Sequence, residues 1–151
     1  MKHLLLIMAI LETFSFADMG EAYEPVNAPA EYVEEEETYY VVPEWTGQKL
    51  APGIGTVYGP TGKETYYNQD MTTLISWARA AGYDAENYPY WIREDGCKML
   101  GKYIMCAANL DHFPRYSLVE SSLGTCIVVD TGDFIYWDEG WSWLDLAVSW
   151  G

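Results

Sequence analysis

The chain has few basic residues, and this scarcity excludes a large class of partners. Its 151 residues include 8 Lys and Arg against 23 Asp and Glu, which gives a formal net charge of −15. Proteins that bind nucleic acids neutralise phosphates with clustered cations, whereas this chain would repel a phosphate backbone. We therefore expect no nucleic acid among its partners.

Histidine and the standard catalytic motifs are scarce as well. The sequence has two histidines, and it contains no glycine-rich phosphate loop, no HExxH pair and no CxxC motif. His112 lies beside Asp111 and near Pro114, a setting that is typical of a loop rather than of a catalytic base. We expect neither a metal site nor a cofactor.

Cysteine is present in an odd number, so at least one thiol has no partner within the chain. The three residues are Cys97, Cys106 and Cys126, and their spacing matches no metal-binding pattern. Cys106 and Cys126 each lie in an apolar run that is typical of a strand. The sequence leaves open whether these two form a disulfide or remain buried thiols.

The apolar run nearest the N-terminus is too short to cross a bilayer. Residues 4–11 are apolar, Lys2 and His3 precede them, and residues 15–17 have the small-x-small pattern that a signal peptidase accepts. We interpret residues 1–17 as a signal peptide and expect a secreted, extracellular or wall-associated protein without stable membrane insertion. The alternative is a buried helix of the mature domain.

An acidic stretch separates this leader from the rest of the chain. Residues 18–48 contain four consecutive glutamates at 34–37 and three prolines, but no Lys or Arg. Such a segment buries too little apolar surface to offset the entropy of ordering it. We therefore predict a disordered tether at 18–48 and one folded domain at 49–151, which we expect to be a monomer.

The folded part has one helical pattern followed by short strand patterns. Asp70 can cap a helix over residues 71–81, and Gly82 supplies a left-handed stop. The strand-like runs that follow, at 90–92, 103–107, 125–129 and 143–148, are separated by turn residues. The pattern predicts a mainly β fold, a small barrel with one short helix.

Two acids lie in apolar surroundings. Asp130 ends the apolar run 126–129 and precedes the turn residues Thr131 and Gly132, while Asp145 interrupts the run 143–148. A partly buried carboxylate costs free energy unless it is hydrogen-bonded or takes part in chemistry, and a neighbouring like charge raises its pKa. These acids are therefore candidate catalytic groups. The alternative is a carboxylate that accepts backbone N–H groups at a turn.

The sequence resembles the three-aspartate family of wall-remodelling proteins. The resemblance rests on the segments 107–114, 122–124, 129–132 and 144–147, and it covers roughly residues 58–150. Residues 58–68 are similar to the clostridial branch. The resemblance implies a six-stranded double-psi β-barrel, a fold that also occurs in membrane-bound lytic transglycosylase A, and it implies peptidoglycan glycan strands as the partner.

The same resemblance implies roles for individual residues. Asp145 corresponds to the catalytic acid and base, and Asp130 shapes its environment, with Thr131 and Gly132 in support. Asn109 takes the position of the family's first aspartate, and Asp111 could substitute for it.

A further departure from the family is Asp133, which stands where the family's Asp-Thr-Gly-Gly motif has its second glycine. The sequence has 7 Trp and 13 Tyr, and such rings suit both a small core and the apolar faces of sugars. We expect Tyr66, Tyr67 and Trp143 to contact the substrate.

The expected reaction is lytic transglycosylation, which needs a single acid and base. The acid protonates the glycosidic oxygen, and the sugar's own C6 hydroxyl then attacks to give a 1,6-anhydro product. Two alternatives stay open. One is a hydrolase in which Asp130 and Asp145 act as a pair. The other is a non-catalytic wall-binding or glycan-binding barrel in which aromatic residues such as Trp137 and Trp141 stack on sugars.

Overall fold

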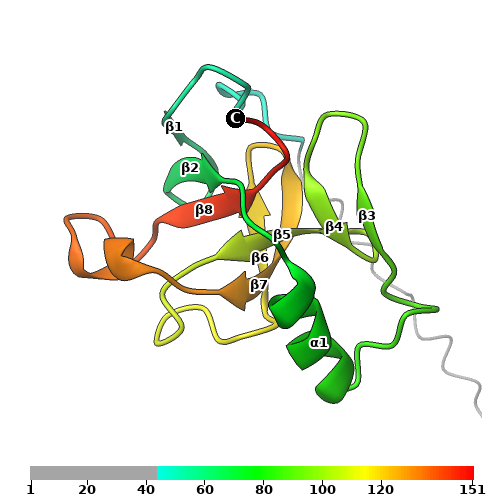
Figure 1. Cartoon of the computed structure of the whole chain (residues 1–151). Helices are drawn as coiled ribbons and strands as arrows, with labels where there is room; N and C mark the ends of the chain where they lie inside the picture. The colour runs from blue at the N-terminus through cyan, green and yellow to red at the C-terminus, as the bar shows by residue number, and fades with distance from the viewer. Residues whose placement is uncertain (1–43) are drawn as a thin grey trace, which may run out of the picture. The chain divides into compact units, whose positions relative to one another are not determined.

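A computed structural model describes residues 44–151, which form a mainly β structure with one short α-helix (Figure 1). The helix α1 spans Thr72–Ala80, and a 3-10 helix η1 spans Asp133–Tyr136. The strands are β1 Val57–Tyr58, β2 Lys63–Tyr67, β3 Tyr90–Ile92, β4 Lys98–Leu100, β5 Tyr103–Ala107, β6 Leu118–Ser121, β7 Gly124–Asp130 and β8 Leu144–Ala147.

The expected signal peptide at 1–17 and most of the expected tether at 18–48 lie outside the described residues. Leu50 is the first buried residue of the described part, which is compatible with a domain that starts near Lys49. In this part of the chain, neither helix has the length and apolarity needed to cross a lipid bilayer.

All eight strands belong to one mixed sheet, and β5 is its central strand (Figure 1). One edge of β5 pairs in parallel with β7. Its other edge is shared, because β4 pairs with the start of β5 and β8 with its end, both antiparallel. The prediction of a mainly β fold with one short helix is confirmed. The backbone ladders leave the sheet open, with β1, β3 and β6 each paired to one neighbour only.

Side chains link the open margins of the sheet to the β6–β7 hairpin. The hydroxyl of Thr61, in the β1–β2 turn, donates to the carbonyl of Glu120 at 2.8 Å. Arg93, just after β3, donates to the carbonyl of Leu123 at 3.0 Å. The hairpin therefore contacts both margins, although no backbone ladder joins it to either of them.

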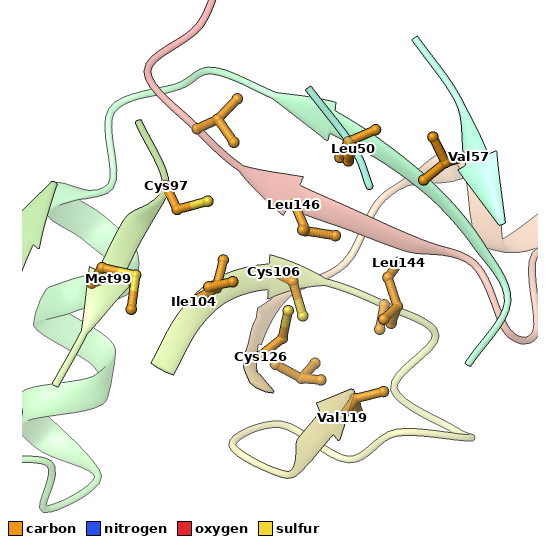
Figure 2. Packing of buried hydrophobic residues seen from close by; sticks show 13 residues of the cluster. Leu50, Val57, Cys97, Met99, Ile104, Cys106, Val119, Cys126, Leu144 and Leu146 are labelled. Atoms are coloured by element: carbon orange, nitrogen blue, oxygen red, sulfur yellow. The ribbon is translucent and has the colours of Figure 1, made fainter. Parts of the chain in front are cut away.

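The central strands are buried on both faces, which explains their continuous apolar sequence. On β5 and β7, alternate residues such as Ile104 and Cys126 join one core cluster, shown in Figure 2. The residues between them, such as Met105 and Ile127, join a second core beneath α1. In Figure 2 the sulfur atoms of Cys106 and Cys126 point toward one another, but all three cysteines are free buried thiols.

The helix α1 largely follows its predicted limits. The carboxylate of Asp70 accepts the backbone N–H of Thr72 at 2.8 Å, so it satisfies a free donor of the first turn, although Met71 holds the cap position. Gly82 has a φ of 99°, and Tyr83 N–H donates to the carbonyl of Ala78 at 3.0 Å, which is a Schellman ending. The predicted end at 81 is one residue too late, because the residue at that position caps the helix.

A buried carboxyl group on β2 fixes the contact between this strand and the β6–β7 hairpin. Glu64 is 0% exposed, and its two oxygens accept hydrogen bonds from the backbone N–H and the hydroxyl of Ser122, at 2.8 and 2.6 Å. The Ser122 hydroxyl in turn accepts the N–H of Leu50 at 3.0 Å. A Cβ atom on Gly59 would lie 1.7 Å from a Glu64 oxygen, so only glycine fits there. Burial raises the pKa of Glu64, and the hydrogen bonds from Ser122 only partly oppose it.

We predict that Glu64→Gln flattens the pH dependence of stability. Because the folded-state pKa of Glu64 lies above its usual 4.5, its contribution is complete below that value and is lost as pH rises through the folded-state pKa. Glutamine cannot ionise, so the free energy of unfolding should fall less with rising pH than in wild type. Urea unfolding at a series of pH values measures this. Glu94→Gln, which removes an exposed carboxylate, is the control, and a slope equal to that of wild type in Glu64→Gln would contradict the prediction.

Candidate functional site

The two predicted acids lie in one hollow of about 440 Å³. Its walls come from β2, from the ends of β5 and β7, from β8 and from the segment between β7 and β8. The predicted residues that line it are Tyr66, Tyr67, Asp130, Thr131, Gly132, Trp143 and Asp145. The hollow is also lined by Thr65, Gln69, Asp133 and Trp137.

The register of β5 with its two neighbours places the acids on the two sides of one small residue. Ala107 lies opposite Asp130 on β7 and opposite Asp145 on β8. Thr65 on β2 lies opposite Asp145. Residues opposite each other in a sheet project from the same face, so the four side chains form a row, Thr65, Asp145, Ala107 and Asp130. Ala107 itself is 4% exposed and packs in a small cluster with Phe134 and Trp143.

A shift in register between Cys106 and Ala107 produces this arrangement. Cys106 pairs with Val128, but the next residue pairs with Asp130 rather than with Val129. Such a bulge re-aims the side chains that follow it. Because of the shift, Asp130 lies opposite Ala107, while Val129 joins the core beneath α1.

Asp145 is partly buried and is held by a chain of two hydrogen bonds. The indole N–H of Trp143 donates to Thr65 Oγ1 at 2.7 Å, and the Thr65 hydroxyl donates to Asp145 Oδ1 at 2.7 Å. Burial raises the pKa of Asp145, the Thr65 hydrogen bond opposes this, and the charge of Asp130 raises it further. This environment favours the protonated acid that a proton donor requires.

Asp130 is oriented by three donors. Its Oδ1 accepts the backbone N–H of Thr131 at 2.9 Å, and its Oδ2 accepts the Gln69 amide at 3.0 Å and the Tyr67 hydroxyl at 3.5 Å. Burial, together with the nearby charge of Asp130, raises the pKa of Tyr67, so its phenol stays protonated and can donate. Tyr67, which we expected to contact the substrate, therefore also donates a hydrogen bond to Asp130.

A buried lysine positions one wall of the hollow. Lys98 on β4 donates to the side-chain oxygen of Asn68 at 2.7 Å and to the backbone carbonyl of Gln69. It thereby fixes the segment between β2 and α1 from which Gln69 reaches Asp130. Sequence reasoning missed Thr65, Gln69 and Lys98, because nothing in their local sequence indicates that they lie near the acids.

The structure does not bring Asn109 and Asp111 into the lining of the hollow. They form a turn after β5, in which the side-chain oxygen of Asn109 accepts the N–H of Asp111 at 3.0 Å. The Asn109 carbonyl accepts the N–H of Phe113 at 2.8 Å, and Asp111 is exposed. Asn109 therefore stabilises a turn, and Asp133, which does line the hollow, supplies the third acid there.

The expected sugar-contacting aromatics differ in their surroundings. Trp143 is 8% exposed, packs against Phe134 and has the Lys63 ammonium 3.7 Å from its ring centre. Tyr66 borders the hollow, but its ring packs edge-on against Trp150 at 5.0 Å. Trp137, which the sequence indicated only for the binding alternative, is 61% exposed and lines the hollow.

A second, larger hollow of about 640 Å³ lies between residues 44–49 and the β6–β7 hairpin. Its carboxylates each interact locally, Glu120 with Thr125 at 2.8 Å and Glu44 with Lys49 at 3.9 Å. The smaller hollow is the stronger candidate, because several acids border it and the pKa of one of them is raised. Within residues 44–151, no group of three His, Cys, Asp or Glu side chains is placed to bind a metal ion.

Comparisons with protein-family models, with curated proteins and with solved structures give no match. The three-aspartate assignment therefore stays a prediction from the sequence.

Gly132 is restricted by a close contact rather than by its backbone angles. Its φ is −157°, an extended angle that any residue adopts. A Cβ atom at this position would lie 3.1 Å from the ring of Phe134, a residue of η1.

We predict that Gly132→Val lowers the free energy of unfolding by about 1–3 kcal/mol, because the added methyl groups must displace the Phe134 ring. Gly55→Val is the control, since a Cβ atom at Gly55 meets nothing within 4 Å, and it should change stability by less than about 1 kcal/mol. Urea unfolding measures both variants. Equal stability losses in the two would show that the Phe134 contact is not the constraint.

Proposed function

We propose that this protein cleaves peptidoglycan glycan strands by lytic transglycosylation, with Asp145 as both acid and base. The observation that carries the proposal is the row of Thr65, Asp145, Ala107 and Asp130, in which a partly buried acid with a raised pKa borders an open hollow. The substrate class comes from the sequence resemblance. Export through a leader at 1–17 is part of the same proposal.

In the proposed reaction, Asp145 first donates a proton to the substrate and then accepts one from it. Protonated Asp145 donates to the glycosidic oxygen while the bond from that oxygen to C1 breaks. The C6 hydroxyl of the same sugar bonds to C1, and the Asp145 carboxylate accepts the hydroxyl proton, which restores the acid. Asp130 has two roles in this reaction. Its charge raises the pKa of Asp145, and it stabilises the positive charge that develops at C1.

We also propose that the strands form the double-psi barrel that the resemblance implies. Supporting features are the mixed pairing of β5, parallel to β7 and antiparallel to β8, and the side-chain links that join the open margins to the β6–β7 hairpin. The buried contact between Glu64 and Ser122 adds a third link. In this arrangement, side-chain hydrogen bonds join the margins of the sheet that no backbone ladder connects.

An inverting hydrolase is the second candidate, and one feature favours it. Asp130 and Asp145 both line the hollow, and the charge of Asp130 acts on Asp145. An inverting glycosidase uses two such carboxyl groups, one as the acid and one as the base that activates water. The products distinguish the two reactions, because hydrolysis leaves a reducing end and transglycosylation leaves an anhydro sugar.

We predict that Asp145→Asn reduces the release of 1,6-anhydro products from purified peptidoglycan by about 10²-fold or more. An amide keeps the shape of the side chain but cannot donate and then accept the proton. Mass spectrometry of the soluble products measures the effect, and thermal unfolding checks the fold. Glu94→Gln is the control for loss of an acid. Reducing-end products from wild type would favour the hydrolase, and undiminished anhydro products from Asp145→Asn would overturn the assignment of Asp145.

We predict that substitutions at Thr65 and Asp130, the two residues that act on the pKa of Asp145, shift the pH profile of activity in opposite directions. Wild-type activity should fall as pH rises through the raised pKa of Asp145, because the proton donor is lost. Thr65→Val removes a hydrogen bond that lowers this pKa, so the alkaline limb should move to higher pH. Asp130→Asn removes a charge that raises it, so the limb should move to lower pH.

Initial rates of product release across pH measure both variants. Shifts in the same direction would show that the variants act through general loss of structure rather than through the Asp145 proton.

A further inference from the structure

The segment between β7 and β8 exposes large aromatic side chains next to the hollow. Tyr136, Trp137 and Trp141 are 83%, 61% and 60% exposed. Trp137 borders the hollow, and its ring centre lies 5.7 Å from that of Trp143. Aromatic rings of this size are usually buried, so a group of them in solvent beside a site indicates a binding surface.

Buried contacts hold the backbone that carries these rings. Phe134 is 7% exposed and packs in a small cluster with Trp143. Gly140 is buried, and a Cβ atom there would lie 2.4 Å from the Phe134 carbonyl, so this turn closes tightly on itself. Glu139 of the same segment accepts the Tyr58 hydroxyl at 2.9 Å, which links this segment to β1. The exposed rings are therefore presented by a fixed turn.

A second aromatic contact lies outside the lining of the hollow. The ring of Trp141 meets the ring of His112 edge-on, with centres 5.1 Å apart. His112 belongs to the turn after β5 that also contains Asn109. The same segment thus carries two aromatic contacts, Trp137 with Trp143 at the hollow and Trp141 with His112 outside its lining.

We infer that residues 133–143 form a binding surface for several consecutive units of an uncharged sugar chain, so that the site acts within long strands. This inference rests on the proposed function and deepens it. The flat faces of Trp137 and Trp141 suit the C–H faces of sugar rings, and the carboxylates of Asp133, Asp138 and Glu139 can accept hydroxyl hydrogens. The same carboxylates would repel an anionic polymer, which favours a neutral chain as the occupant.

The surface has a direct consequence for substrate length. A chain that fills the hollow and also covers Trp137 and Trp141 gains contacts that a short fragment lacks. Removing one ring should weaken binding of a long chain by roughly two- to tenfold, which corresponds to about 0.4–1.4 kcal/mol. Binding of a fragment that occupies only the hollow should depend on Trp137 and not on Trp141.

The experiment measures binding of a long strand and of a tetrasaccharide of β-1,4-linked N-acetylglucosamine, which carry no charge, by calorimetry, in the full-length protein carrying Asp145→Asn so that the ligand stays intact. Trp141→Ala should lower affinity for the long strands several-fold and leave the tetrasaccharide unaffected. Trp137→Ala should lower both. Trp77→Ala is the matched control, because Trp77 is 52% exposed but lies on α1. Thermal unfolding confirms that each variant is folded.

The outcomes separate this inference from the proposed reaction. If Trp141→Ala binds long strands as well as the parent, or if Trp77→Ala loses as much affinity, the binding surface is wrong even where wild type releases anhydro products. If Trp141→Ala selectively loses affinity for long strands while wild type releases no product at all, the binding surface stands and the proposed catalysis fails.

Discussion

The site depends on one constraint, the shift in register that pairs Ala107 with Asp130. Without it, Val129 would lie opposite Ala107, and the carboxylate at the end of β7 would project from the other face of the sheet. Because β5 also pairs with β8, the same residue fixes Asp145 on its other side. The two acids therefore share a hollow because the end of β5 pairs with β7 on one edge and with β8 on the other, and the β5–β7 ladder contains one bulge.

Placing like charges in one partly buried hollow costs free energy, and the surroundings show how the cost is reduced. Asp130 receives three donors, while Asp145 receives one from Thr65 and is left with a raised pKa. The two carboxyl groups thus have unequal environments, which suits unequal roles in proton transfer. The cost of burying Glu64 is reduced in another way. Both of its carboxyl oxygens accept hydrogen bonds from Ser122 in a buried contact between β2 and the β6–β7 hairpin.

Much of the β structure could be predicted from local sequence. The expected runs at 90–92 and 103–107 coincide with β3 and β5, and those at 125–129 and 143–148 overlap β7 and β8. Strand β2 was not predicted, because its sequence Lys-Glu-Thr-Tyr-Tyr has a buried glutamate where an apolar residue would be expected. Only a partner such as Ser122, 58 positions further along the chain, makes that burial possible.

The sequence by itself determined the place of the helix to within one residue at each end, the apolar strands and the position of an acid at the end or middle of two of them. These features follow from local rules, namely capping, side-chain periodicity and the cost of burying a charge. Only the tertiary structure decided that Asp130 and Asp145 share a hollow with Thr65 and Gln69, while Asn109 and Asp111 form a turn outside its lining. The physical reason is that strand pairing and register join residues far apart in the chain, and a shift of one residue changes which side chains meet.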